Sequence, residues 1–152
     1  MTRIARSLIL LLAVVAVVGC GATMERGRQS VGRVTYQVSG GITGWDRTLT
    51  VEPDGTARLA VSHGPTPPAA SRQVDSAVLA RLHSLVSDPA FARLDSAYLP
   101  SPGGADLQDY LLTAEVGGRT IRTMSRDGAS APPILREVMS LLNGILAEQN
   151  GP

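Results

Sequence analysis

The feature that most constrains the fold is a glycine turn between two segments of alternating polarity. Residues 47–51 and 56–61 have the two-residue period of half-buried strands, and Pro53-Asp54-Gly55 lies between them. A three-residue hairpin loop needs a left-handed residue, which Gly55 supplies. This loop pairs Val51 with Ala57 and Leu49 with Leu59, which keeps the apolar side chains on one face. The sequence therefore predicts an antiparallel hairpin here.

A second glycine turn predicts a second hairpin. Residues 107–116 and 119–124 flank Gly117-Gly118, a pair that tolerates the positive φ angles of a two-residue turn. The expected pairs are Val116 with Arg119, Ala114 with Ile121, and Leu112 with Thr123. One face of this hairpin would then be apolar throughout, because it carries Tyr110, Leu112, Ala114, Val116 and Ile121.

A further strand and a helix complete the first half of the chain. Val34, Tyr36 and Val38 alternate with polar residues, which is typical of a strand. Residues 62–72 contain three prolines and are expected to form an irregular surface connection. Apolar residues at helical spacing then predict a helix from about Asp75, its N-cap, to a stop before Pro89.

The last segment predicts a second helix and fixes the expected fold class. Pro132 or Pro133 would lie in its first turn, and apolar residues follow at helical spacing through Leu146. The order is then strand, strand, strand, helix, strand, strand, helix. We expect an α+β domain, with an antiparallel sheet of about five strands and two helices packed on one of its faces.

Composition excludes several classes of protein. The chain has 152 residues, of which 43% are hydrophobic and 18% charged, so it suits one globular domain and not a disordered chain. Fourteen basic residues, all arginine, stand against 13 acidic ones, for a net charge of +1. Because no basic excess is present, we expect no nucleic-acid binding.

The N-terminus has the features of an export signal. Arg3 and Arg6 precede an unbroken apolar run over residues 8–18, which is shorter than the ~20 residues of a membrane-spanning helix. The run ends in Val17-Val18-Gly19-Cys20, which resembles the bacterial lipobox. The resemblance implies cleavage before Cys20 and attachment of diacylglycerol, and in many bacteria a further acyl chain such as palmitate, to that cysteine. A secretory peptide with a cysteine near its cleavage site is the alternative.

These features divide the chain into three parts. We expect a lipoprotein signal peptide over residues 1–19, a lipidated N-terminus and flexible tether over residues 20–30, and one domain over residues 31–148. The lipid on Cys20 would hold the domain at the extracytoplasmic side of the bacterial cell membrane, in the periplasm or on the cell envelope. Without Arg3 and Arg6 the mature chain has a net charge of −1, so nothing else draws it to anionic lipid.

No catalytic or metal-binding set of residues is found. His63 and His83 lie on different expected elements, and Cys20 is the only cysteine. Asp109 and Glu115 would lie far apart on the solvent side of one strand, so they do not form a carboxylate pair. We therefore expect a protein that is not an enzyme and that binds no metal and no cofactor.

An ordered set of motifs resembles the emfourin-like family of protealysin inhibitors. The set begins with the glycine segment at residues 36–44 and a leucine-rich helix that ends near Pro89. It continues with Asp106-Leu107-Gln108-Asp109-Tyr110 and Pro132-Pro133-Ile134-Leu135 at the start of the last helix. The lipobox, the turn at Pro53 and the long 62–72 connection depart from the family pattern.

The resemblance implies a monomeric domain that binds and inhibits a thermolysin-like metallopeptidase. A rigid loop is needed to enter a cleft, and we expect the partner-binding residues to be Gly40, Gly41, Ile42, Thr43, Gly44 and Trp45. In the purely structural interpretation, the glycines only connect two strands and Trp45 belongs to the core. The alternative function is a non-inhibitory protein-interaction module of the cell envelope.

Overall fold

A computed structural model describes residues 29–65, 71–101 and 104–149. The expected signal peptide, the lipid-attachment residue Cys20 and the tether up to residue 28 lie outside the described residues. The described ranges cover most of the expected domain over residues 31–148.

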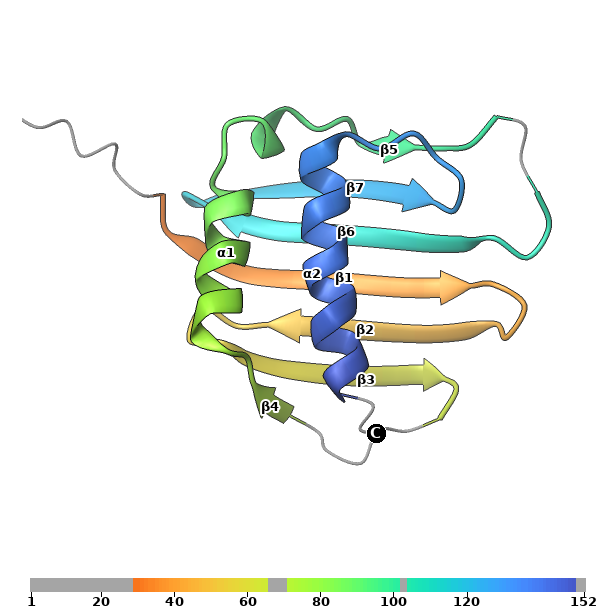
Figure 1. Cartoon of the computed structure of the whole chain (residues 1–152), viewed down its shortest axis with the longest axis horizontal. Helices are drawn as coiled ribbons and strands as arrows, with labels where there is room; N and C mark the ends of the chain where they lie inside the picture. Colours follow the sequence, from red (N-terminus) through yellow and green to blue (C-terminus); the bar gives the residue numbers. More distant parts are fainter. Residues whose placement is uncertain (1–28, 66–70, 102–103, 150–152) are drawn as a thin grey trace, which may run out of the picture.

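The domain is built on one seven-stranded sheet (Figure 1). In chain order the strands are β1 (Val31–Gly40), β2 (Trp45–Val51), β3 (Thr56–His63), β4 (Ser71–Gln73), β5 (Ala97–Tyr98), β6 (Gln108–Val116) and β7 (Arg119–Arg126). Across the sheet their order is β4-β3-β2-β1-β6-β7-β5. All neighbours are antiparallel except β5, which pairs with β7 in parallel.

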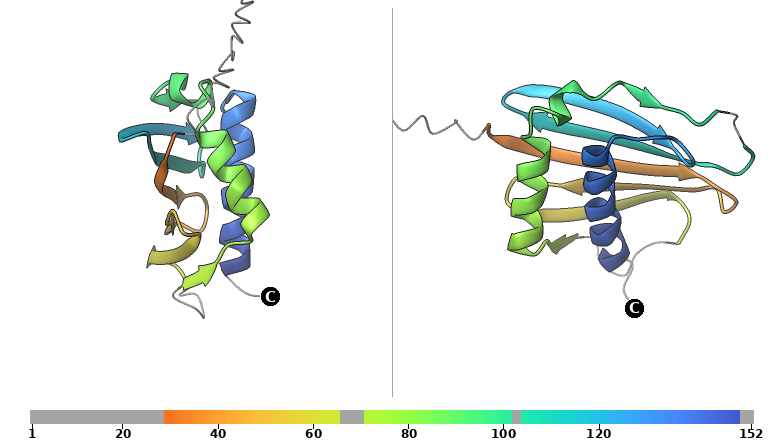
Figure 2. Two further views of the ribbon diagram at one scale, coloured as in Figure 1. Left: turned by 90° about the vertical axis from the view of Figure 1, so that its left-hand side faces the viewer. Right: turned by 45° about the horizontal axis from the view of Figure 1, so that its top comes forward.

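Two helices cover one face of this sheet and leave the other face open (Figure 2). The helix α1 (Ser76–Val86) begins where the carboxylate of Asp75 accepts hydrogen bonds from the backbone of Ala77 and Val78, so Asp75 is the predicted N-cap. A short 3-10 turn, η1 (Phe91–Arg93), follows the helix. The second helix, α2 (Pro133–Gln149), starts with proline, which needs no backbone donor there.

The core lies between the sheet and the two helices. Inward residues of the strands alternate with outward ones, and Tyr36, Leu49 and Leu112 are among the inward residues that are fully buried. From the other layer, α1 contributes Leu82, and α2 contributes Leu135, Val138 and Leu142. Phe91 of η1 is also fully buried. The chain is therefore an α+β domain with two helices on one face of a sheet.

Both predicted hairpin registers are confirmed. Around the first turn, Val51 pairs with Ala57 and Leu49 with Leu59. Around Gly117-Gly118, the pairs are Val116 with Arg119, Ala114 with Ile121, and Leu112 with Thr123. Turn chemistry set both registers, because each loop has one length that keeps the apolar side chains on the helix-covered face.

The sheet is wider than predicted and is mixed. The expectation of about five antiparallel strands missed β4 and β5, which have three and two residues. Residues 62–72 were expected to be irregular, but β3 continues through His63 and β4 begins at Ser71. These edge strands carry no alternating pattern, because their places depend on pairing with β3 and β7 and not on burial of their own side chains.

The strands give the sheet two distinct ends. At the near end β1 begins, and the β2–β3 and β6–β7 turns lie beside it, as the left side of Figure 1 shows. At the far end lie the β1–β2 turn, the segment after β5, the start of β6 and the end of β7. The ten residues of β1 separate the two ends by about 30 Å.

Candidate functional site

The six residues expected to bind a partner lie together at the far end. Gly40 and Trp45 form the last pair between β1 and β2, and residues 41–44 make the loop beyond them. The loop is closed by a hydrogen bond from the Gly44 amide to the Gly41 carbonyl, at 3.0 Å. The arrangement is the tip of a hairpin, so the glycines do connect two strands.

A neighbouring segment holds this turn in place. The Gly41 amide donates to the carbonyl oxygen of Leu107 at 3.1 Å, and a Cβ at Gly40 would lie only 2.8 Å from the same oxygen. Gly40 has φ +84°, a left-handed conformation that side chains disfavour. Glycine is therefore required at position 40 for two independent reasons, and the turn is braced against the start of β6.

Ile42 projects from the braced turn into solvent. Its side chain is 87% exposed, and within the described ranges the only other strongly exposed large apolar residue is Leu99, at 55%. Leu99 follows β5 and also lies at the far end, where a Cβ added at Gly128 would lie 3.6 Å from Pro100. Three strand spacings, about 14 Å in all, separate β1 from β5. Both exposed apolar side chains therefore lie at the same end of the molecule.

Leu99 is a candidate that sequence reasoning missed. An apolar residue beside the prolines and glycines of an exposed loop was the available signal. Its meaning depended on the parallel pairing of β5 with β7, which brings residue 99 to the end of the sheet that carries Ile42.

Trp45 is partly exposed and lies outside the buried core, so the interpretation of Trp45 as a core residue is wrong. The guanidinium of Arg47 lies 5.0 Å from the centroid of its ring, within the range of a cation–π contact. Gly64 also approaches the ring, since a Cβ there would lie 3.1 Å from two of its carbons. The indole is thus held at the sheet end, next to the glycine turn.

Two tyrosines and an aspartate brace the sheet behind the turn. The rings of Tyr36 and Tyr110 stack with centroids 6.2 Å apart. The Tyr36 hydroxyl donates to Asn143 of α2, and the Tyr110 hydroxyl donates to Asp127 at 2.7 Å. Asp127 also accepts from the Gln108 amide, which joins the start of β6 to the end of β7. Tyr110 therefore lies on the apolar face expected for it and joins β6 to the end of β7.

Both phenols stay neutral at physiological pH. Burial, with a smaller contribution from Tyr110, raises the pKa of Tyr36 well above its ordinary value. Burial and then the hydrogen bond to Asp127 raise the pKa of Tyr110 to about 12. Neither pKa is moved towards neutral pH, so neither phenol has the lowered pKa that would favour a phenolate there.

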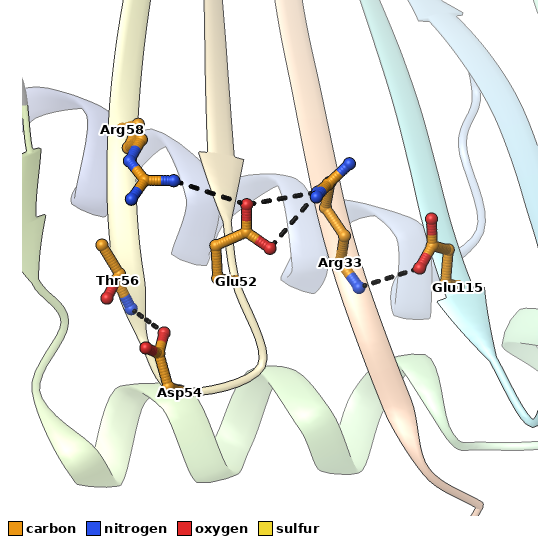
Figure 3. A network of polar contacts seen from close by, with 6 residues as sticks. All are labelled: Arg33, Glu52, Asp54, Thr56, Arg58 and Glu115. Atoms are coloured by element: carbon orange, nitrogen blue, oxygen red, sulfur yellow. Dashed lines mark hydrogen bonds and ion pairs between the residues drawn. The ribbon is translucent and has the colours of Figure 1, made fainter.

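Several charged residues on the open face of the sheet, near the β2–β3 turn, pair with one another (Figure 3). Glu52 of β2 lies between Arg33 and Arg58, with its Oε1 3.2 Å from Arg33 Nε and 3.7 Å from Arg58 Nη1. Glu115 accepts from the Arg33 amide, and Asp54 accepts from the Thr56 amide. The shallow hollow here, about 500 Å³, is lined chiefly by these residues and threonines. Paired charges on a solvated face offer no convergent catalytic group.

Asp109 and Glu115 lie far apart on that open face, as expected. Asp109 forms an ion pair with Arg126, with Oδ1 2.7 Å from Arg126 Nε, at the far end of β6. The hydrogen bonds from Arg126 are the main cause that lowers the pKa of Asp109. Glu115 lies at the near end of the same strand. The two carboxylates therefore do not act as a pair.

The described part of the chain contains no group of three or more metal-ligating side chains. His63 ends β3 opposite Asp46, and His83 lies on α1 beside a hollow of about 390 Å³ at the near end. The two histidines are on different elements, as predicted. Within the same described residues, no helix has the length and apolarity needed to cross a membrane.

Comparisons with known proteins do not assign the chain to a family. No protein-family model matches the chain, and no curated protein is significantly similar to it. The resemblance to the emfourin-like family therefore remains a prediction, and any function must be inferred from the geometry of the far end.

Proposed function

We propose that this protein is a lipid-anchored extracytoplasmic lipoprotein, not an enzyme, whose domain binds and inhibits a thermolysin-like metallopeptidase. The observation that carries the proposal is the position of Ile42 on a braced turn at the far end of β1. The motifs that resemble the emfourin-like family include this turn. A lipid on Cys20 would hold the opposite end of the domain nearer the membrane.

The geometry suits a protein that presents a loop to a partner. The ten residues of β1 and the tether would carry the turn well away from the lipid surface. A turn that is already ordered in the free protein costs less conformational entropy on binding than a flexible loop does. Ile42 supplies apolar area that water now covers, and Leu99 extends the apolar surface on the same end.

Inhibition is tested with the mature chain, residues 20–152, in which Cys20→Ser prevents acylation. We expect this protein to reduce peptide hydrolysis by a panel of thermolysin-like peptidases at micromolar concentration. Ile42→Asp should weaken the inhibition by about tenfold or more, because it replaces an apolar contact with a charge. Thr120→Asp, which adds the same charge at an exposed near-end position, should leave it unchanged.

Two results would count against this function. Unchanged turnover across the panel would remove the inhibitor proposal and favour the alternative, a non-inhibitory interaction module of the envelope. Equal weakening by Ile42→Asp and Thr120→Asp would show that the turn is not the contact. The lipid attachment has its own test, since mass spectrometry of the mature N-terminus should find an acylated Cys20, and an unmodified cysteine would contradict it.

A further inference from the structure

Arg47 is a cation on the apolar side of β2. It shares the helix-covered face with Leu49 and Val51, and it pairs with Val38 on one side and Val61 on the other. The two-residue period of this strand would place an apolar residue at position 47. An arginine there needs an explanation from its surroundings.

Those surroundings leave the guanidinium without an acid partner. Its Nε is shielded from solvent and has no hydrogen-bond acceptor, and its charge lies over the ring of Trp45. Among the described residues no carboxylate oxygen lies within 4.0 Å of the side chain of Arg47, although four other arginines form such ion pairs. Shielded guanidinium nitrogens are normally hydrogen-bonded, because desolvation without a partner is costly.

Two acidic residues at the far end are already engaged in hydrogen bonds with other residues. Asp46 follows Trp45 but faces the open side of the sheet, where it accepts from Gln37 at 3.1 Å. Asp127 is on the helix-covered side and accepts from Tyr110 and Gln108. Within the part of the chain that the structure describes, no carboxylate therefore neutralises the positive charge of Arg47.

We propose that Arg47 and Trp45 form a subsite that receives a carboxylate group of the bound partner protein. The proposal rests on the proposed function only in placing the partner at the far end. Only Nε of Arg47 is among the shielded atoms without a partner, so the two terminal nitrogens, Nη1 and Nη2, are the ones that would hold a carboxylate through two parallel hydrogen bonds, and the indole presents a flat apolar wall beside them. With Ile42 on the adjoining turn, the surface fits an acidic side chain that lies next to an apolar patch on the partner.

The test uses a small carboxylate and needs no peptidase. The mature Cys20→Ser chain has one tryptophan, so it gives a single indole N–H signal in NMR spectra. We expect N-acetyl-aspartate amide to shift this signal saturably, and N-acetyl-asparagine amide to leave it in place. No shift, or the same shift with both compounds, would overturn the proposal.

Two variants separate binding from a purely structural role of Arg47, which pairs with the buried Val38 across the β1–β2 ladder. Arg47→Gln should weaken the response to N-acetyl-aspartate amide by about tenfold or more, because it removes the charge and the fork. Arg122→Gln, an exposed arginine on the open face, is the matched control and should respond as the parent does. Full binding by Arg47→Gln would overturn the proposal.

Arg47→Lys covers the case in which the glutamine variant does not fold. It keeps the charge but loses the fork, so it should bind several-fold more weakly than the parent, and undiminished binding would contradict a bidentate contact. Because no peptidase is present, a negative result here leaves the inhibitor proposal standing. If the NMR titration shows binding but the inhibition assay shows none, the subsite proposal would stand and the peptidase proposal would be contradicted.

Discussion

The two ends of the sheet use similar turns for different purposes. At the near end, the Pro53-Asp54-Gly55 turn is covered by other parts of the domain, since Val74 donates to the Gly55 carbonyl and Gln73 donates to the Asp54 carbonyl. At the far end, the β1–β2 turn is braced at its base but leaves its tip uncovered. A glycine turn is thus not functional in itself, and what packs around it decides its role.

The apolar residues show the same contrast. Phe91, beside the near end of the sheet, is fully buried, whereas Ile42 at the far end is 87% exposed. Burial of a large apolar side chain contributes to folding, and an exposed one leaves its apolar area available for a partner. Under the proposed function, the near end would contribute mainly to stability and the far end to binding, and this difference is open to measurement.

The largest expected effect comes from truncating one apolar residue at each end. Phe91→Ala should lower the free energy of unfolding by about 3–5 kcal/mol, because it leaves a cavity in the core. Ile42→Ala should change it by less than about 0.5 kcal/mol, because its side chain has few neighbours. Urea unfolding measures both changes. A large loss of stability in Ile42→Ala would contradict the claim that Ile42, unlike Phe91, contributes little to folding.

A smaller difference is expected between two left-handed glycines. Gly55→Ala should cost about 2 kcal/mol of unfolding free energy, because its φ is +86° and its Cβ would meet Gln73 and Leu79 at 2.6 and 2.9 Å. Gly44→Ala should cost about 1 kcal/mol, since its φ is +61° but nothing lies within 4 Å of the added carbon. Thermal or urea unfolding gives the order of the two, and the reverse order would refute the packing argument.

The smallest effect is a pH dependence at the far end. The pKa of Asp109 is lowered in the folded state by hydrogen bonds from Arg126, so the unfolded chain takes up the proton first as the pH falls. The stabilisation is present above the unfolded-state pKa of about 3.9 and is lost as the pH falls through the lower folded-state value. Arg126→Gln should reduce stability at pH 7 and make it fall less steeply below pH 4. Unfolding curves from pH 2 to pH 7 test this, and identical pH profiles would contradict it.

The sequence was sufficient where structure depends on neighbours in the chain. Both hairpin registers followed from loop length, glycine and alternation, and Asp75 was recognised as an N-cap from its place before a periodic segment. Each of these features needs only a few consecutive residues to specify it. Local chemistry therefore predicted most of the sheet.

Sequence reasoning was insufficient where structure depends on distant partners. β4 pairs with β3 across the connection at residues 64–70, and β5 pairs with β7 across the whole of β6, and neither short strand has a hydrophobic pattern. The sequence also did not decide whether Trp45 is buried or exposed, because an indole that follows a glycine turn is compatible with either position. The unusual place of Arg47 had a local signal, since it breaks the alternation of Leu49 and Val51, but its lack of a partner did not.

The central position of β1 has a mechanical consequence. β1 begins where the chain comes from the N-terminal segment, is paired along its length with β2 and β6, and ends at the turn that carries Ile42. A pulling force between a lipid on Cys20 and a partner at the turn would run along this one strand. Because β1 is already extended, its covalent backbone would carry the tension between the two attachment points and the hydrogen bonds to β2 and β6 would not have to break, so forced unfolding, and with it release of the partner by domain failure, would be slow.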